Sequence, residues 1–142
     1  MQLPKDKECA LCGKQNYPIV WINEFCRVML INDQSYPGYC RVDLINHKKE
    51  MSDLTDVEKV KLMQVVFKVE SLIKFSIKPA KINLASLGNI IPHVHWHVIP
   101  RFERDRHFPK SIWSDSQRTS KIKDFEAGKE KEFIEYLYAG LN

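Results

Sequence analysis

The stretch Pro92-His93-Val94-His95-Trp96-His97-Val98-Ile99-Pro100 decides the fold of this chain, because histidine alternates in it with apolar residues. A period of two predicts a β-strand, in which successive side chains point to opposite faces of a sheet. We therefore expect the three histidines on one face, about 6.6 Å apart along the strand, and Val94, Trp96 and Val98 in the core. Imidazole changes protonation near neutral pH and can act as a nucleophile, an acid, a base or a metal ligand. Three of them on one face of an apolar strand indicate a reaction centre.

The segments before this strand predict further strands. Apolar, strand-like runs cover residues 19–22, 25–31, 39–45 and 81–87. The last of these runs is joined to the histidine strand by a short turn at Gly88-Asn89. So short a connection makes the two strands antiparallel neighbours.

Two helices are also predicted. Thr55 with Glu58 three residues later is typical of a capping box, and Pro79 marks the end of the helix, near Ile77. Its apolar stripe consists of Val57, Val60, Met63, Phe67, Val69, Leu72 and Ile73. We expect this stripe to pack on one face of the sheet as core. A second helix is predicted over residues 126–141.

The composition is that of an ordinary globular chain. With 142 residues, 44% of them hydrophobic and 28% charged, it has room for one core and is too apolar for a disordered chain. No apolar run approaches the roughly 20 residues of a membrane span, and Met1–Asp6 does not resemble a signal peptide. We therefore expect a cytoplasmic protein with no membrane partner. The net charge of +4 is mild and no nucleic-acid module is recognisable, so no nucleic-acid partner is expected.

The cysteines fall into two groups. In a cytoplasmic chain we expect them to be reduced thiols or metal ligands. Cys26 and Cys40 sit in strand-like runs and are expected in the core. Cys9-Ala10-Leu11-Cys12-Gly13 places two thiols three positions apart at a turn, where both can reach one metal ion. A thioredoxin-like redox pair would begin a helix after a strand, and that context is missing here.

The alternation His93-Val94-His95-Trp96-His97-Val98-Ile99 resembles the signature of the histidine-triad (HIT) superfamily of nucleotide hydrolases and transferases. Pro37-Gly38, Leu54, Asn83 and Gly88-Asn89 also fall at landmarks of that family. The resemblance covers about residues 9–102 and is greatest to bacterial diadenosine polyphosphate hydrolase-like HIT proteins. It implies an α+β, HIT-like fold, with a five-stranded antiparallel sheet, one main helix, a C-terminal helix and assembly as a homodimer. We expect a single domain over residues 1–142, with residues 103–142 as a C-terminal extension.

The resemblance also implies roles for the three histidines. His95 would be the nucleophile that attacks the α-phosphorus of a nucleoside phosphoanhydride, giving a nucleotidyl-histidine that water then hydrolyses. His97 would assist the phosphate and the leaving group, and His93 would orient His95. This chemistry requires no cofactor.

Three asparagines are the implied nucleotide-binding residues. Asn32 matches a ribose-binding position, Asn83 matches a further polar contact, and Asn89 and nearby amides would stabilise phosphate charge. The sequence departs from the family at Ile90, where many members carry a hydroxyl residue. It also has Pro100-Arg101-Phe102 in place of the Gly-Gly segment of the phosphoramidase branch, which argues against phosphoramidase as the main activity.

A structural zinc site is implied by the same resemblance. Cys9, Cys12, His47 and His93 occupy the positions of the zinc ligands in several bacterial HIT proteins. A set of two cysteines and two histidines closes a tetrahedral site, which suits structure and not catalysis.

Two other functions remain open from the sequence. The protein could be a nucleotide-binding module without significant turnover, because the same residues would form its site. It could also be a zinc enzyme with histidine ligands, but the outer Cα atoms of the triad lie about 13 Å apart on a strand. Such a site would need a ligand from elsewhere, such as His107 or His47.

Overall fold

The computed structural model describes residues 8–33, 35–119, 122–126 and 128–142. The prediction about a signal peptide rests on Met1–Asp6, which lies outside the described residues. In the described part of the chain, no helix is both long and apolar enough to cross a membrane.

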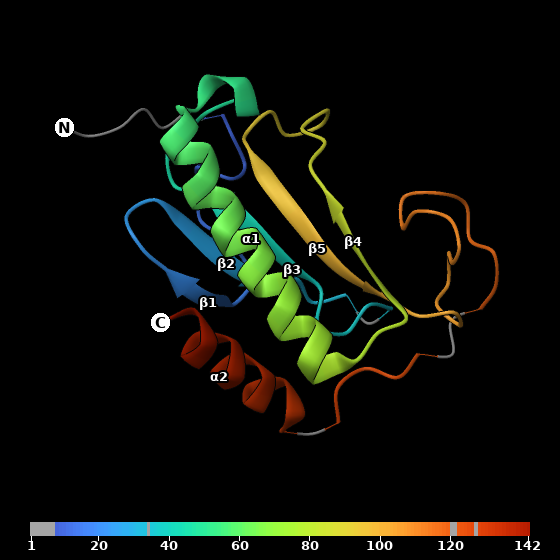
Figure 1. Cartoon of the computed structure of the whole chain (residues 1–142). Coiled ribbons are helices and arrows are strands. Elements are labelled where there is room, and N and C mark those ends of the chain that lie inside the picture. Colours follow the sequence, from blue (N-terminus) through green and yellow to red (C-terminus); the bar gives the residue numbers. More distant parts are fainter. Residues whose placement is uncertain (1–7, 34, 120–121, 127) are drawn as a thin grey trace.

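Five strands form one antiparallel sheet, as the alternating patterns predict (Figure 1). The strands are β1 (Ile19–Ile22), β2 (Cys26–Leu30), β3 (Cys40–Leu44), β4 (Lys81–Ala85) and β5 (His95–Arg101). Their order is β1-β2-β3-β5-β4, so the histidine strand β5 lies between β3 and β4. The expected antiparallel pairing of β4 with β5 is confirmed.

The two faces of the sheet differ in chemistry because side chains alternate along each strand. On β3, Cys40, Val42 and Leu44 are buried in the main core, and Val98 of β5 joins them there. Arg41 and Asp43, between them on β3, point to the opposite face. We call this opposite face, which also carries His95 and His97, the histidine face.

The long helix α1 (Asp56–Ile77) packs on the apolar face of the sheet (Figure 1). The capping box of Thr55 and Glu58 is present, and Lys78, with a φ of 54°, ends the helix before Pro79. A short 3-10 helix (Met51–Asp53) precedes it.

The prediction for the apolar stripe of α1 is partly wrong. The fully buried residues are Leu62, Val66, Val69 and Ile73. By contrast, Val57, Val60 and Phe67 are exposed. At 3.6 residues per turn these three lie on the side of the helix turned away from the buried set. The helix therefore has two apolar faces, and spacing alone does not indicate which one is covered.

Helix α2 (Lys129–Leu141) packs against α1 and against β1 (Figure 1). Phe133 and Leu137 are its buried residues. Gly140 permits the close approach to α1, because a Cβ at this position would lie 2.5 Å from Leu72 Cδ2. The helix begins three residues later than predicted, after Gly128 with a φ of 85°.

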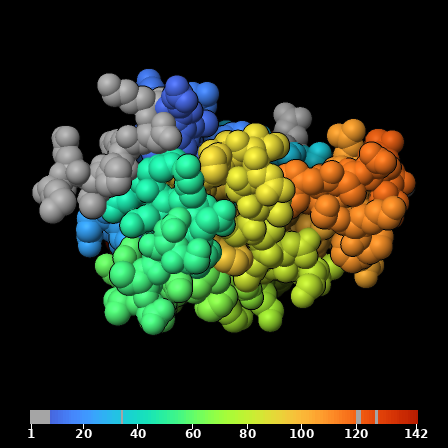
Figure 2. All heavy atoms as spheres, turned by 90° about the horizontal axis from the view of Figure 1, so that it is seen from above, coloured from blue at the N-terminus to red at the C-terminus, as the bar shows by residue number. Residues whose placement is uncertain are grey.

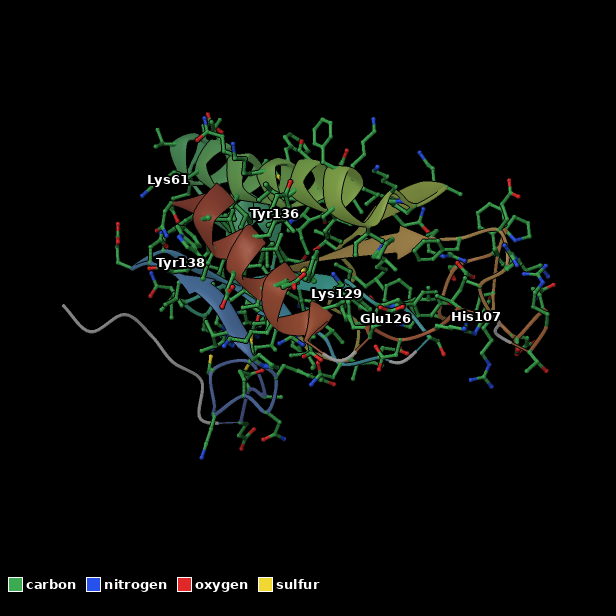
Figure 3. The ribbon with its side chains drawn as sticks, turned by 90° about the horizontal axis from the view of Figure 1, so that it is seen from below. Lys61, His107, Glu126, Lys129, Tyr136 and Tyr138 are labelled. Atoms are coloured by element: carbon green, nitrogen blue, oxygen red, sulfur yellow. The ribbon has the colours of Figure 1, made fainter. Side chains whose placement is uncertain are left out.

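Two surface segments flank β5. Figure 2 shows the segment before it, in yellow, lying beside the orange segment that follows it. The segment after β5 extends away from both helices, and Figure 3 places its His107 at the opposite end of the molecule from Lys61 and Tyr138.

Candidate active site and metal cluster

His95 and His97 lie next to each other on the histidine face. Their ring centroids are 5.0 Å apart and the two rings are nearly perpendicular. His95 is 7% exposed, and its Nδ1 donates a hydrogen bond of 2.6 Å to the carbonyl of His93. With the proton held on Nδ1, the lone pair of Nε2 is available for attack on an electrophile. This is the geometry that a nucleophilic histidine needs.

His97 is held by an aromatic residue from the start of β3. The hydroxyl of Tyr39 forms a hydrogen bond with His97 Nδ1. Burial of the His97 imidazole, with the nearby His95 and Arg41, lowers its pKa to about 4. Burial also raises the pKa of Tyr39, so its phenol stays protonated. His97 is therefore neutral at physiological pH and interacts with a protonated hydroxyl.

The third histidine of the predicted triad has different surroundings. The strand begins at His95, so the expectation that all three side chains share one strand face is correct for His95 and His97 alone. His93 is fully buried and faces His47, with ring centroids 5.1 Å apart. Its carbonyl orients His95, and its imidazole belongs to another cluster. The chain bends at His93, just before the strand begins.

Cys9, Cys12, His47 and His93 come together, with ligand atoms all within 4.8 Å of one another. His93 Nδ1 lies 3.5 Å from each sulfur and 3.2 Å from His47 Nδ1. Tetrahedral zinc with Zn–S of about 2.3 Å and Zn–N of about 2.1 Å requires ligand atoms roughly 3.4–3.8 Å apart. The four residues named from the sequence thus have a spacing that fits such an ion.

The protonation of His93 also fits a metal ligand. Its Nε2 donates a hydrogen bond of 2.8 Å to the carbonyl of Leu44. This hydrogen bond leaves the Nδ1 lone pair directed at the two thiols and His47. A carbonyl that holds the second ring nitrogen is the usual support of a histidine ligand. Burial lowers the pKa of His93, which favours the neutral form that binds metal.

A buried charge network connects the metal cluster with the histidine face. The fully buried carboxylate of Asp43 accepts hydrogen bonds from Arg27 Nε at 3.1 Å and Arg41 Nε at 2.6 Å. Arg27 also donates to the carbonyl of Leu11, and Arg41 to Gln15 Oε1. On the neighbouring strand, Asp43 is the register partner of His95 and Arg41 that of His97. The loop that carries the cysteines is thereby fixed against the strand beside the two histidines.

The three predicted nucleotide-binding asparagines lie apart from one another. Asn83, on β4, accepts a hydrogen bond of 2.7 Å from Arg101 Nη1. Asn89 is exposed on the turn that follows Gly88, whose φ is 76°. Asn32 is exposed and lines a cavity of about 260 Å³ together with Asp33, Gly38 and Glu130; no histidine of the described residues lines it. The ribose assignment of Asn32 stays a prediction.

Sequence reasoning did not identify Tyr39, Arg41 or Asp43 as site residues. Arg41 and Asp43 carry charge in a strand whose other side chains are apolar. Two charges at alternate positions of a strand indicate that its second face is polar, and this signal was present in the sequence. The contact of Tyr39 with His97 depends on the pairing of β3 with β5, which local patterns do not specify.

The fold and the site define a class of α+β proteins in which a histidine-bearing strand faces the open side of an antiparallel sheet. Comparison with known families identifies this class. The family model of the HIT domain matches residues 14–104, and the chain belongs to this family. The resemblance to the HIT superfamily is thus confirmed. Among curated proteins, the chain is similar to the AP-4-A phosphorylase of Mycobacterium tuberculosis, with 32% identity over 78 residues. That match covers 51% of this chain and 40% of the relative, so the chain spans about two fifths of the relative's length.

Solved structures show the same fold. A histidine triad protein from Bradyrhizobium japonicum superposes with a TM-score of 0.75 at 26% identity, covering 89% of this chain and 92% of the other. A histidine triad protein from Marinobacter aquaeolei has a TM-score of 0.73 at 18% identity, covering 98% and 96% of the two chains. These likenesses confirm the predicted α+β architecture, and at 18% identity the second shows the fold alone.

Proposed function

We propose that this protein transfers a nucleotidyl group from a nucleoside phosphoanhydride to His95 and then to water. The observation that carries the proposal is the hydrogen bond from His95 Nδ1 to the carbonyl of His93, which leaves Nε2 as the attacking atom. Membership of the HIT family supports a nucleotide-processing activity. The AP-4-A phosphorylase relative supports a diadenosine polyphosphate as the substrate class.

The reaction proceeds in two steps. The Nε2 lone pair of His95 attacks the α-phosphorus, a P–N bond forms, and the P–O bond to the leaving polyphosphate breaks. Water then attacks the same phosphorus, the P–N bond breaks, and the nucleoside monophosphate is released. The Tyr39 hydroxyl donates to Nδ1 of neutral His97, which places the His97 proton on Nε2. That N–H donates to the phosphate and to the leaving oxygen.

The acceptor decides whether the enzyme is a hydrolase or a phosphorylase. With diadenosine tetraphosphate, water as acceptor gives AMP and ATP, whereas inorganic phosphate gives ADP and ATP. We propose water as the acceptor. The test is chromatography of the products formed with and without inorganic phosphate, by the native protein and by His95→Ala. We expect AMP in both conditions and at least a thousandfold slower turnover in the variant; ADP that appears only with phosphate would contradict hydrolysis.

Substrate contacts complete the proposed site. Asn89 and the amides of its turn are proposed to bind the phosphate, Asn83 a polar group of the nucleotide, and Asn32 the ribose. For Asn83 and Asn89 the support is their position on β4 and on the turn that leads towards His95. Support for Asn32 comes from its match to the family position alone.

A zinc ion held by Cys9, Cys12, His47 and His93 is proposed as a structural element. The spacing of the four ligand atoms and the orientation of His93 support it. Zinc would tie the N-terminal loop to the segment that leads into β5. Within the described residues, the group of metal-binding side chains found is this one, and it does not include His95, His97 or His107. Reduced thiols fit the proposed cytoplasmic location.

A homodimer is the proposed assembly. The support is the exposed apolar face of α1, formed by Val57, Val60, Phe67 and Phe75. A second copy carries the same face, so an interface with a twofold axis would cover it in both chains. The interface would therefore be formed by the exposed apolar face of α1.

A further inference from the structure

The segment after β5 is fixed to the body of the protein. The buried carboxylate of Asp105 accepts hydrogen bonds from the backbone amides of Phe102, His107 and Phe108 at 3.0, 3.0 and 2.7 Å. It also accepts from Arg101 Nε at 2.8 Å and Nη2 at 3.0 Å. Arg101 Nη2 donates in addition to the carbonyl of Lys110 at 2.7 Å. The buried ion pair of Arg101 and Asp105 thus holds the segment from Phe102 to Lys110.

Two further contacts hold His107 and Ile112 of this segment against residues near the histidine face. Ile112 packs against a small apolar cluster formed by Tyr36, Tyr39 and Ile99. The hydroxyl of Tyr36 forms a hydrogen bond with His107 Nδ1. The position of Ile112 fixes its neighbour, Trp113.

Trp113 lies against His97. Their ring centroids are 4.9 Å apart with an interplanar angle of 70°, and the tryptophan is 51% exposed. Trp113 also lines a cavity of about 530 Å³ with Ile112, Asn83, Ala85 and Ile99. The cavity runs along the outer strand β4 and is lined by no histidine of the described residues; Ala85, the register partner of His97, is where it approaches the proposed site. Its size is in the usual range for a small-molecule pocket.

We propose that Trp113 stacks on the aromatic base at the far end of the leaving polyphosphate, and so determines specificity for dinucleotides. The inference rests on the proposed function. A leaving group departs on the side of the phosphorus opposite the attacking His95, and His97 is the residue that assists it. Trp113 is in contact with His97 and presents a half-exposed indole on a fixed backbone. An aromatic platform of this kind binds a base by stacking with little loss of conformational freedom.

The test compares two ligands with the same transferred nucleotide. Diadenosine tetraphosphate has a leaving group that ends in adenosine, whereas adenosine 5′-tetraphosphate has one without a base. Binding is measured by calorimetry on His95→Ala, which cannot turn either ligand over. We expect Trp113→Ala, introduced into the His95→Ala protein, to weaken the binding of diadenosine tetraphosphate by roughly 5- to 150-fold. Binding of adenosine 5′-tetraphosphate should change less than twofold, and Trp113→Phe should retain most of the affinity.

Tyr138→Ala is the matched control, because Tyr138 is 54% exposed and lies at the opposite end of the molecule from this segment (Figure 3). It should leave both affinities unchanged. Equal loss for the two ligands would place the transferred nucleotide on Trp113 and overturn the proposal, as would no loss at all. Absence of binding by either ligand to folded His95→Ala would overturn the proposed function as well. The ratio of kcat/KM for the two substrates, measured with His95 intact, gives the same comparison if the double variant does not fold.

Discussion

At the scale of single residues, two neighbouring imidazoles on β5 have different environments. His95 is oriented by a backbone carbonyl, and His97 by a phenol, with Arg41 nearby. A nucleophile needs an available lone pair, and a neutral donor needs a proton that is not lost or gained near pH 7. These different partners support the proposed division of roles between the two histidines.

The low pKa of His97 predicts a pH-dependent stability. The native imidazole has a pKa of about 4 and the unfolded one a value near 6.5. Between these values the unfolded chain binds more protons, so the free energy of unfolding decreases as the pH falls from about 6.5 to about 4. In His97→Gln this contribution is absent. Urea denaturation at pH 7 and pH 5 should show a smaller pH effect in the variant, and equal pH effects in the two proteins would contradict the assignment.

Asn32 has two possible roles that mutation can separate. If its side chain binds ribose, the lost hydrogen bonds act equally in the ground and transition states, so Asn32→Ala should raise KM by roughly three- to tenfold with kcat unchanged. If Asn32 only belongs to the loop after β2, the melting temperature should fall and KM stay the same. Steady-state kinetics and a thermal melt on one preparation distinguish the two. An unchanged KM would end the ribose assignment.

At the scale of elements, the cysteine loop depends on two sets of contacts. The proposed zinc would join Cys9 and Cys12 to His47 and His93, and Arg27 and Arg41 hold the same loop through Leu11 and Gln15. A metal that binds only the folded state stabilises it by RT ln(1 + [M]/Kd), where [M] is the free metal concentration.

We therefore expect close to one zinc per chain in native protein and little in Cys12→Ser. A chelator should lower the melting temperature of native protein by roughly 5 °C or more, and that of the variant much less. Cys26→Ala is the control, because Cys26 is fully buried in the core and is not one of the four clustered residues; it should lower stability while retaining metal. Metal analysis that finds fully stable, zinc-free native protein would contradict the site.

The elements that the sequence predicted well are those with local signals. The capping box at Thr55, the turn at Gly88 and the alternation in β5 all depend on residues close in sequence. The exposed face of α1 was assigned to the core because helical spacing marks an apolar stripe without saying what covers it. Contacts across strands, such as Tyr39 with His97, require the register of β3 on β5 and could not be predicted locally. The position of Trp113 depends on the buried pair of Arg101 and Asp105, which joins residues on either side of a turn.

At the scale of the whole molecule, the exposed apolar residues of α1 predict self-association. Phe67 is 52% exposed on the face opposite the buried one. Replacing it with glutamate would place a charge in the proposed interface, so Phe67→Glu should elute as a monomer where the native protein is a dimer. Tyr138→Glu alters an equally exposed aromatic on α2 and should leave the dimer intact. Light scattering coupled to gel filtration measures both, and a native protein that is monomeric at all concentrations would contradict the proposed assembly.

The central claim is that His95 forms a covalent bond to the nucleotide, and mass spectrometry of the intact protein tests it most directly. Native protein, His97→Ala and His95→Ala are each mixed with diadenosine tetraphosphate and quenched rapidly at alkaline pH, where a phosphorus–nitrogen bond survives. The account predicts a gain equal to one adenylyl group, mapped by fragmentation to the peptide that contains His95, and no gain in His95→Ala. Turnover by native protein without any such adduct in the native protein or the His97 variant, or an adduct on another residue, would contradict it.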